Sequence, residues 1–321
     1  MKNQGIITLL LLAALPVFSI AQQVTIKPNW KKGDERHVTA STKMVCLLGK
    51  DTIINTSATE TSRIKVENST KDGYIVSYTY ESMETPKISM PMLDTIDKAQ
   101  AVFAVLGSLM KAIENVAKEL QVNYRIDPAG EAVSIEDFDK TFNNYIKATL
   151  AVFRDFTASL KSKYGDSLDL PIDSNKVKTM AGALKDKFRQ QLLNEVNYFN
   201  QAYYEMTYDK TKIKTTKAVI KDIDVMRYGD VKVPGNVITE VLKTAPGTLK
   251  VKITTQYDNA ALKKVFKEQL GKQVDGLSSI TDWMVLEYEP NSFWIRKIEE
   301  SQQMKINEMM VKSTSTTVFK N

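Results

Sequence analysis

Residues 74–81, Tyr-Ile-Val-Ser-Tyr-Thr-Tyr-Glu, carry the pattern that decides the fold class. Every second residue from Tyr74 to Tyr80 is tyrosine or valine, and these side chains fall on one side of an extended chain. Residues 71–73, Lys-Asp-Gly, form a turn signal just before the segment. We therefore predict a β-strand that begins at this turn.

Two further strands precede this one. Residues 36–48 are rich in Val, Thr and Met, and residues 52–66 are rich in Thr, Ile and Ser. Gly49-Lys50-Asp51 between them has the composition of a tight hairpin connection. Three consecutive strands joined by short turns predict an antiparallel meander.

The C-terminal part of the chain returns to strand composition, with turns at Gly229-Asp230, Pro234-Gly235 and Ala245-Pro246-Gly247. A short helix is predicted over residues 259–270. The predicted strands are 204–208, 215–228, 235–242, 248–257, 282–288, 293–303 and 305–319.

The middle of the chain changes to helical periodicity. Apolar residues repeat at three and four positions over residues 98–120, over a helix of about 25 residues capped by Ser134 or Asp137, and again over 177–199. A hairpin with a Pro-Ala-Gly turn over residues 122–135 separates the first two of these helices. The first half of the first helix is apolar nearly all round, which predicts burial on more than one side.

The predicted fold class is therefore α+β: a curved antiparallel sheet, similar to a half-barrel, formed by N- and C-terminal strands. A mainly helical middle, about residues 98–203, packs on this sheet or is enclosed by it. No glycine- or proline-rich linker separates the parts, which favours a single domain over residues 22–321. A helical insertion domain is the alternative.

The N-terminus predicts export. Lys2 is followed by an apolar run from Ile6 to Ile20 and by the small residues Ser19 and Ala21 at a cleavage site. We expect residues 1–21 to be a signal peptide, cleaved near Ala21-Gln22, and the protein to be periplasmic or secreted. The rest of the chain contains no apolar stretch that predicts a membrane span.

Composition excludes several classes of function. The chain has 44 Lys and Arg against 38 Asp and Glu, interleaved without long basic runs, so nucleic acid is not an expected partner. Cys46 is the single cysteine and lies in an apolar stretch, which predicts a buried thiol and no internal disulfide. His37 is the single histidine, and neither a two-histidine zinc site nor a Gly-x-Ser-x-Gly nucleophile motif is present.

The unusually apolar residues 99–110 and the methionine-rich segment before them suggest an apolar ligand site, because methionines line adaptable binding surfaces. The predicted ligand-binding residues are Met83, Met90, Met92, Val102, Phe103, Leu106 and Met110. No catalytic residue, metal ligand or cofactor is predicted.

Two interpretations of the three tryptophans stay open. Trp30, Trp283 and Trp294 fall in or beside predicted strands, where they could be half-buried core residues. Alternatively they line a cavity together with the tyrosine-rich strand 74–81 and the apolar helix 99–110.

The chain resembles poorly characterised exported proteins of Bacteroidota. The resemblance rests on Ser-Ile-Ala-Gln at residues 19–22, Trp-Lys-Lys-Gly-Asp-Glu-Arg at 30–36, and Tyr-Arg-Ile-Asp-Pro-Ala-Gly-Glu at 124–131. In its order of strands, helices and strands it also resembles periplasmic lipoprotein carriers of the LolA type. That second resemblance implies a curved sheet and helices around an apolar cavity.

These observations predict a non-enzymatic envelope protein that binds a lipid-like or other apolar ligand, or an apolar segment of a partner protein. The alternative is a structural or interaction module of the outer envelope with a filled core. The sequence is also compatible with a hydrolase that uses carboxylates and with a Cu(I)-binding protein that uses the thioethers of Met90 and Met92.

Overall fold

The computed structural model describes the part of the chain that forms most of the sheet. The described residues are 23–84, 87–89, 121–164, 179, 182, 183, 185–190, 192, 193, 196, 207–209, 217–228, 231–242, 248–270 and 277–321. The predicted signal peptide and the predicted helix over 98–120 lie outside them.

Most described strands and helices match predicted elements, but the predicted turn at Pro234-Gly235 is wrong because both residues lie inside β10, and β12 begins five residues before the predicted strand 282–288. Strands 36–48, 52–66 and 74–81 of the predicted meander correspond to β2, β3 and β4, and the predicted helix 259–270 corresponds to α5. The elements are β1 (Gln23–Thr25), β2 (Glu35–Leu48), β3 (Asp51–Thr70), β4 (Gly73–Met83), β5 (Lys87–Ser89), β6 (Gln121–Ile126), β7 (Ala132–Glu136), α3 (Phe138–Tyr164), β8 (Thr207–Asp209), β9 (Lys217–Tyr228), β10 (Val231–Leu242), β11 (Leu249–Tyr257), α5 (Asn259–Leu270), β12 (Leu277–Tyr288), β13 (Ile295–Ile306) and β14 (Met309–Lys320).

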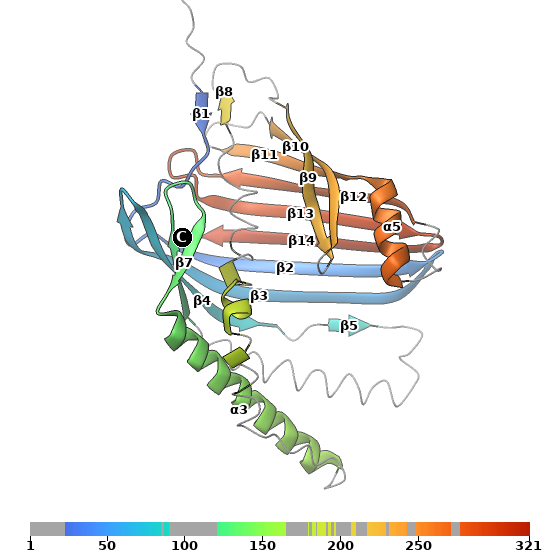
Figure 1. Cartoon of the computed structure of the whole chain (residues 1–321), viewed down its shortest axis with the longest axis horizontal. Coiled ribbons are helices and arrows are strands. Elements are labelled where there is room, and N and C mark those ends of the chain that lie inside the picture. The colour runs from blue at the N-terminus through green and yellow to red at the C-terminus, as the bar shows by residue number, and fades with distance from the viewer. Residues whose placement is uncertain are drawn as a thin grey trace, which may run out of the picture.

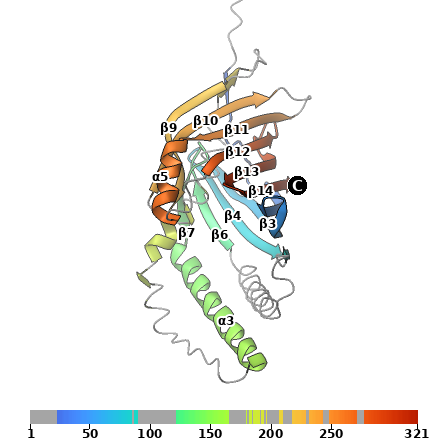
Figure 2. The same ribbon diagram turned by 90° about the vertical axis from the view of Figure 1, so that its right-hand side faces the viewer.

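One twelve-stranded antiparallel sheet dominates the structure (Figure 1). The strand order is β7-β6-β4-β3-β2-β14-β13-β12-β11-β10-β9, and β5 pairs with β3. The path ends at β7 and β9, so the described sheet is open. Figure 2, turned by 90°, shows its twist, as expected for a sheet of this size.

The two ends of the chain meet in the centre of the sheet. The C-terminal strand β14 pairs with β2 along its full length, from Met309 opposite Leu48 to Lys320 opposite His37. The prediction that N- and C-terminal strands share a sheet is therefore confirmed. The separate two-stranded sheet of β1 and β8 lies beside one end of this large sheet.

The predicted fold class, an α+β fold with a mainly helical middle, is wrong. The described part of residues 98–203 begins with β6 and β7, and β6 pairs with β4, so the middle of the chain extends the large sheet. Of the helices, α3 begins at this hairpin and α5 connects two strands. Long-range strand pairing, which local periodicity does not report, therefore determines the architecture.

At one level of the sheet, strands β11, β12 and β13 place apolar residues on one face and charged residues on the other. We define the inner face as the face that carries Ala40, whose row across the strands is Val251, Leu286, Ile298, Thr317, Ala40 and Glu60. The adjacent row on the outer face is Lys250, Glu287, Lys297, Val318, Thr39 and Thr61. This alternation is typical of an antiparallel sheet with one covered face.

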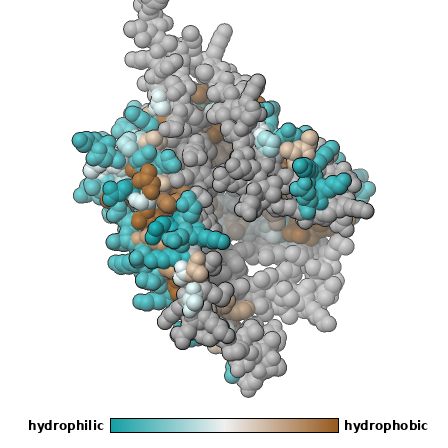
Figure 3. All heavy atoms as spheres, in the orientation of Figure 1, coloured by the Kyte–Doolittle hydropathy of each residue, from teal (hydrophilic) through white to brown (hydrophobic). Residues whose placement is uncertain are grey.

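Two apolar clusters cover the ends of the inner face. The larger contains Trp30, Val66, Val76 and Trp294, and the smaller contains Leu262 of α5 with Ile306. In Figure 3 the visible apolar side chains lie chiefly on the side of β7 and beside α5. Between the clusters runs a polar band, whose residues include Thr42, Ser313, Ser315, Glu300 and Gln302.

The first turns of α3 pack against the larger cluster, and the helix then projects away from the sheet (Figure 1). Phe138 and Phe142 are buried and contact Phe188 at ring-centroid distances of 6.4 and 5.7 Å. Asp139 pairs with Lys185 at 2.7 Å. These contacts hold the described helical residues 185–190, 192, 193 and 196 against the large cluster, beside the pocket described below.

Candidate ligand-binding site

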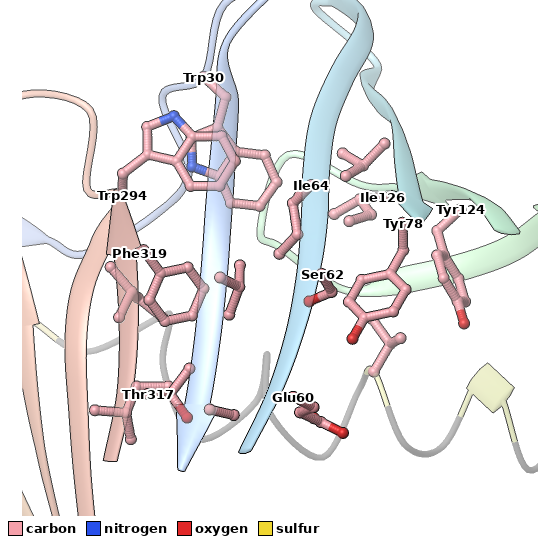
Figure 4. A pocket seen from close by; sticks show the side chains of 16 residues that line it. Trp30, Glu60, Ser62, Ile64, Tyr78, Tyr124, Ile126, Trp294, Thr317 and Phe319 are labelled. Carbon is pink, nitrogen blue, oxygen red and sulfur yellow. The ribbon is translucent and has the colours of Figure 1, made fainter. Parts of the chain in front are cut away.

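A pocket of about 260 Å³ opens on the inner face, at the end of the sheet that carries the larger apolar cluster. It lies where β6, β4, β3, β2, β14 and β13 come together (Figure 4). The lining residues are Trp30, Val38, Ala40, Glu60, Ser62, Ile64, Val76, Tyr78, Tyr124, Ile126, Val196, Trp294, Ile295, Ile298, Thr317 and Phe319.

Two stacked tryptophans form the closed end of the pocket. The rings of Trp30 and Trp294 lie 4.5 Å apart at an interplanar angle of 19°, and they are 6% and 3% exposed. The Trp294 indole N–H donates to Asp34 Oδ2 at 3.0 Å, and this carboxylate also accepts the Lys31 backbone N–H at 2.9 Å. The segment before β2 and the turn before β13 are thereby fixed to each other.

A partly buried ion pair lies behind the Trp294 ring. The Arg36 guanidinium lies 4.9 Å from the Trp294 ring centroid and donates to both carboxylate oxygens of Glu289, at 3.1 and 3.2 Å. The Ser292 hydroxyl donates to Glu289 Oε2 at 2.7 Å. Because charge-assisted bonds of this kind fix geometry, the pair orients Trp294 toward the pocket.

The walls are apolar and come from strands on both sides of β2. Val76, Tyr124 and Ile126 form one side, from β4 and β6, while Ile298 and Phe319 of β13 and β14 form the other. In Figure 4 Phe319 lies on the side of Trp294, while Ile126 and Tyr124 lie on the opposite side, beyond Ile64. The closed part of the pocket therefore offers almost continuous hydrocarbon and aromatic surface.

Polar groups gather at the opposite end of the pocket. In Figure 4 the Glu60 carboxylate, the Thr317 side chain and the hydroxyl of Tyr78 all lie on the side away from the tryptophans. Glu60 is exposed, whereas Ser62, two residues along β3, is 3% exposed. The pocket thus changes from aromatic to polar along its length.

The Tyr78 hydroxyl is held in its neutral form. Burial raises the pKa of Tyr78 above its ordinary value, a hydrogen bond with Ser62 opposes the shift, and the nearby Glu60 charge raises the pKa further. A neutral phenol can both donate and accept hydrogen bonds. The mouth therefore combines a carboxylate with neutral hydroxyl groups.

The predicted ligand residues are placed only in part. Met83 is the last residue of β4, and its backbone lies opposite Glu60 at the pocket mouth. Met90, Met92, Val102, Phe103, Leu106 and Met110 lie outside the described residues.

Trp30 and Trp294 line the pocket together with Tyr78 of the tyrosine-rich strand, as one of the two open interpretations expected, whereas Trp283 is absent from its lining.

Cys46 is 6% exposed, which confirms a buried thiol, and burial raises its pKa. Glu60 and Phe319 were missed because nothing in their local sequence distinguishes them from ordinary strand residues.

The described residues provide neither a candidate metal site nor a helix that could span a membrane. No group of three or more His, Cys, Asp and Glu side chains among them could hold a metal ion. In the same residues no helix is both long enough and apolar enough to cross a bilayer.

Fold and site together define a protein with a large open antiparallel sheet and an apolar pocket on one face. The sequence matches no family model and no curated protein. Among solved structures, one entitled "Lipid-protein interactions in lipovitellin" is similar with a TM-score of 0.40 and 10% sequence identity. The match covers 91% of this chain and 26% of that one, so this chain spans about a quarter of its length.

Proposed function

We propose that this protein binds an apolar or amphiphilic small molecule, such as a lipid with a single chain, in the pocket between the Trp30–Trp294 stack and Glu60. We further propose that it does so without catalysing a reaction, as an exported protein of the cell envelope. The observation that supports binding is the change of the lining from stacked aromatic rings to polar groups.

The energetics of burial favour an alkyl chain as the group that enters the pocket. Each methylene removed from water contributes about 0.8 kcal/mol, and the walls contain few polar atoms that would lose hydrogen bonds to water. The volume of about 260 Å³ lies close to the lower end of the range of roughly 300–1,000 Å³ for small-molecule sites. A small or single-chain ligand fits this size better than a lipid with several chains.

A direct test is to identify what the protein carries. Protein purified without detergent would be extracted with organic solvent, and the extract analysed by mass spectrometry. We expect an amphiphile in near-stoichiometric amount. Its absence from repeated preparations, together with a pocket that binds no added amphiphile, would favour a structural module with a filled core.

Blocking the pocket should abolish binding. Ala40 lines the pocket from the inner face of β2, so Ala40→Trp would place an indole in the cavity. We expect at least a tenfold loss of affinity for N-phenyl-1-naphthylamine, an uncharged apolar fluorophore, because a filled cavity cannot bury it. Fluorescence titration measures this affinity.

Thr39→Trp is the matched control. Thr39 is the neighbouring residue on the same strand, and its side chain lies in the outer-face row with Val318 and Thr61. This variant should bind the fluorophore like the wild type. Equal binding by Ala40→Trp and the wild type, with circular dichroism showing both folded, would exclude the pocket as the binding site.

A further inference from the structure

Among the described residues that line the pocket, Glu60 is the one with a charged side chain. It lies at the polar end, in the row of Ala40 and Thr317, and is exposed. In the described part of the chain no ion pair includes its carboxylate. Since no counter-ion among these residues neutralises it, the negative charge is available to a ligand that enters the pocket.

Two further carboxylates lie on the same face, three and four strands away from Glu60 in the order of the sheet. In the next two rows, away from the tryptophans, lie Glu300 and Asp282. Glu300 accepts a hydrogen bond from the Ser315 hydroxyl at 2.8 Å, and Asp282 accepts one from the Tyr257 hydroxyl at 2.5 Å. Neither of these bonds supplies a positive charge.

Basic side chains of the same strands lie on the opposite face. In the register of β2, β3 and β11–β14, the outer-face positions include Lys43, Arg63, Lys65, Lys250, Lys252, Lys297, Lys305, Lys312 and Lys320. On the inner face Arg36 is the exception, and Glu289 already neutralises it behind Trp294. Lys185 and Arg189, on the helical segment near the pocket, pair with Asp139 of α3.

This separation of charge disfavours an anionic head group at the mouth. A carboxylate or phosphate placed beside Glu60 would meet a like charge, and Arg36, the inner-face exception among these strands, is already paired with Glu289. An ammonium group would instead meet a carboxylate, the Tyr78 hydroxyl and the rings of Tyr78 and Tyr124 (Figure 4). Aromatic rings attract cations through their quadrupoles.

The length of the pocket matches a medium alkyl chain. Glu60 and Ile64 are four residues apart on β3, which corresponds to roughly 13 Å at about 3.3 Å per strand residue. An extended chain advances about 1.3 Å per methylene, so roughly ten methylenes cover this distance. A ten-carbon chain would therefore reach from the carboxylate toward the tryptophans.

From this arrangement we propose that the pocket selects amphiphiles with a cationic head group, an alkyl chain ending in a protonated amine or a quaternary ammonium. The proposal rests on the function proposed above. Glu60 binds the head group, and the Trp30–Trp294 stack contacts the far end of the chain.

The test compares head groups on one chain length. Binding of decylamine, decyltrimethylammonium, decanol and decanoate to the full chain would be measured by calorimetry at neutral pH, below their critical micelle concentrations. We expect both cations to bind about tenfold more tightly than decanol, and decanoate to bind most weakly. The advantage of the cations should shrink as salt is raised, since Glu60 is exposed.

Glu60→Gln should remove this preference while leaving decanol binding unchanged, because glutamine keeps the shape of the side chain and loses its charge. Glu299→Gln, on the outer face, makes the same change in net charge and should keep the preference. If all four compounds bind equally, or Glu60→Gln keeps the preference, the head-group proposal is wrong and apolar binding stands. If none binds, the proposed function itself is wrong.

Discussion

Gly73→Ala is expected to destabilise the protein by about 3 kcal/mol or more, because the added Cβ causes both backbone strain and a steric clash. Gly73 has a φ of 125°, where a side chain is strained. A Cβ added there would lie 2.1 Å from the Ile126 carbonyl oxygen. That oxygen belongs to the backbone of β6, so it cannot move away without disturbing the pairing of β4 with β6.

Urea unfolding followed by circular dichroism would measure the loss. Gly49→Ala is the matched control, since Gly49 also has a positive φ, 61°, but a Cβ there meets nothing within 4 Å. It should cost only about 1 kcal/mol, from the left-handed conformation alone. A similar loss in the free energy of unfolding of the two variants would show that the clash with the Ile126 carbonyl oxygen does not destabilise the protein.

Arg36→Leu is the second change with a large expected effect, a loss of about 3 kcal/mol in the free energy of unfolding. Removing one partner of a buried ion pair leaves the other charge uncompensated, which typically costs about 3–5 kcal/mol. The Arg36 and Glu289 side chains are 11% and 21% exposed, so we expect the lower part of that range. The exposed Arg296, 3.8 Å from Glu289, replaces only part of the interaction.

The double variant Arg36→Leu/Glu289→Leu separates a lost charge partner from lost packing. If the uncompensated carboxylate causes the loss, the double variant should be more stable than the sum of the two single changes predicts. Strict additivity, or a loss below 1 kcal/mol in Arg36→Leu, would show that the pair does not stabilise this end of the sheet. Chemical denaturation of all four proteins provides the measurement.

Local sequence patterns predicted the elements well because each pattern reports on one strand or one turn. The alternation of 74–81 and the turn residues 49–51 correspond directly to β4 and to the β2–β3 connection. The helical middle was predicted wrongly because the hairpin of β6 and β7 lies between helical patterns, and its pairing with β4 is a long-range contact. Periodicity cannot show which sheet a hairpin joins.

Local sequence patterns could not predict the position of the pocket for the same reason. Trp30 and Trp294 stack although they are far apart in the sequence, because β14 pairs with both β2 and β13 and so brings the segments before β2 and β13 together. The inner-face residues of β3 around Glu60 are Ala58, Ser62 and Ile64, which show no clean alternation of apolar and polar residues. Export and cleavage near Ala21-Gln22 stay predictions from the sequence alone.

The central claim is that the cavity between the tryptophan stack and Glu60 holds an amphiphile. A crystal structure with 10-bromodecylamine tests it most directly, because anomalous scattering locates the bromine independently of the interpretation of the density. We expect the bromine in van der Waals contact with Trp30 and Trp294, within about 4–5 Å, and the amine nitrogen beside the Glu60 carboxylate. A bromine peak elsewhere on the molecule, or an empty cavity at saturating ligand, would contradict the claim.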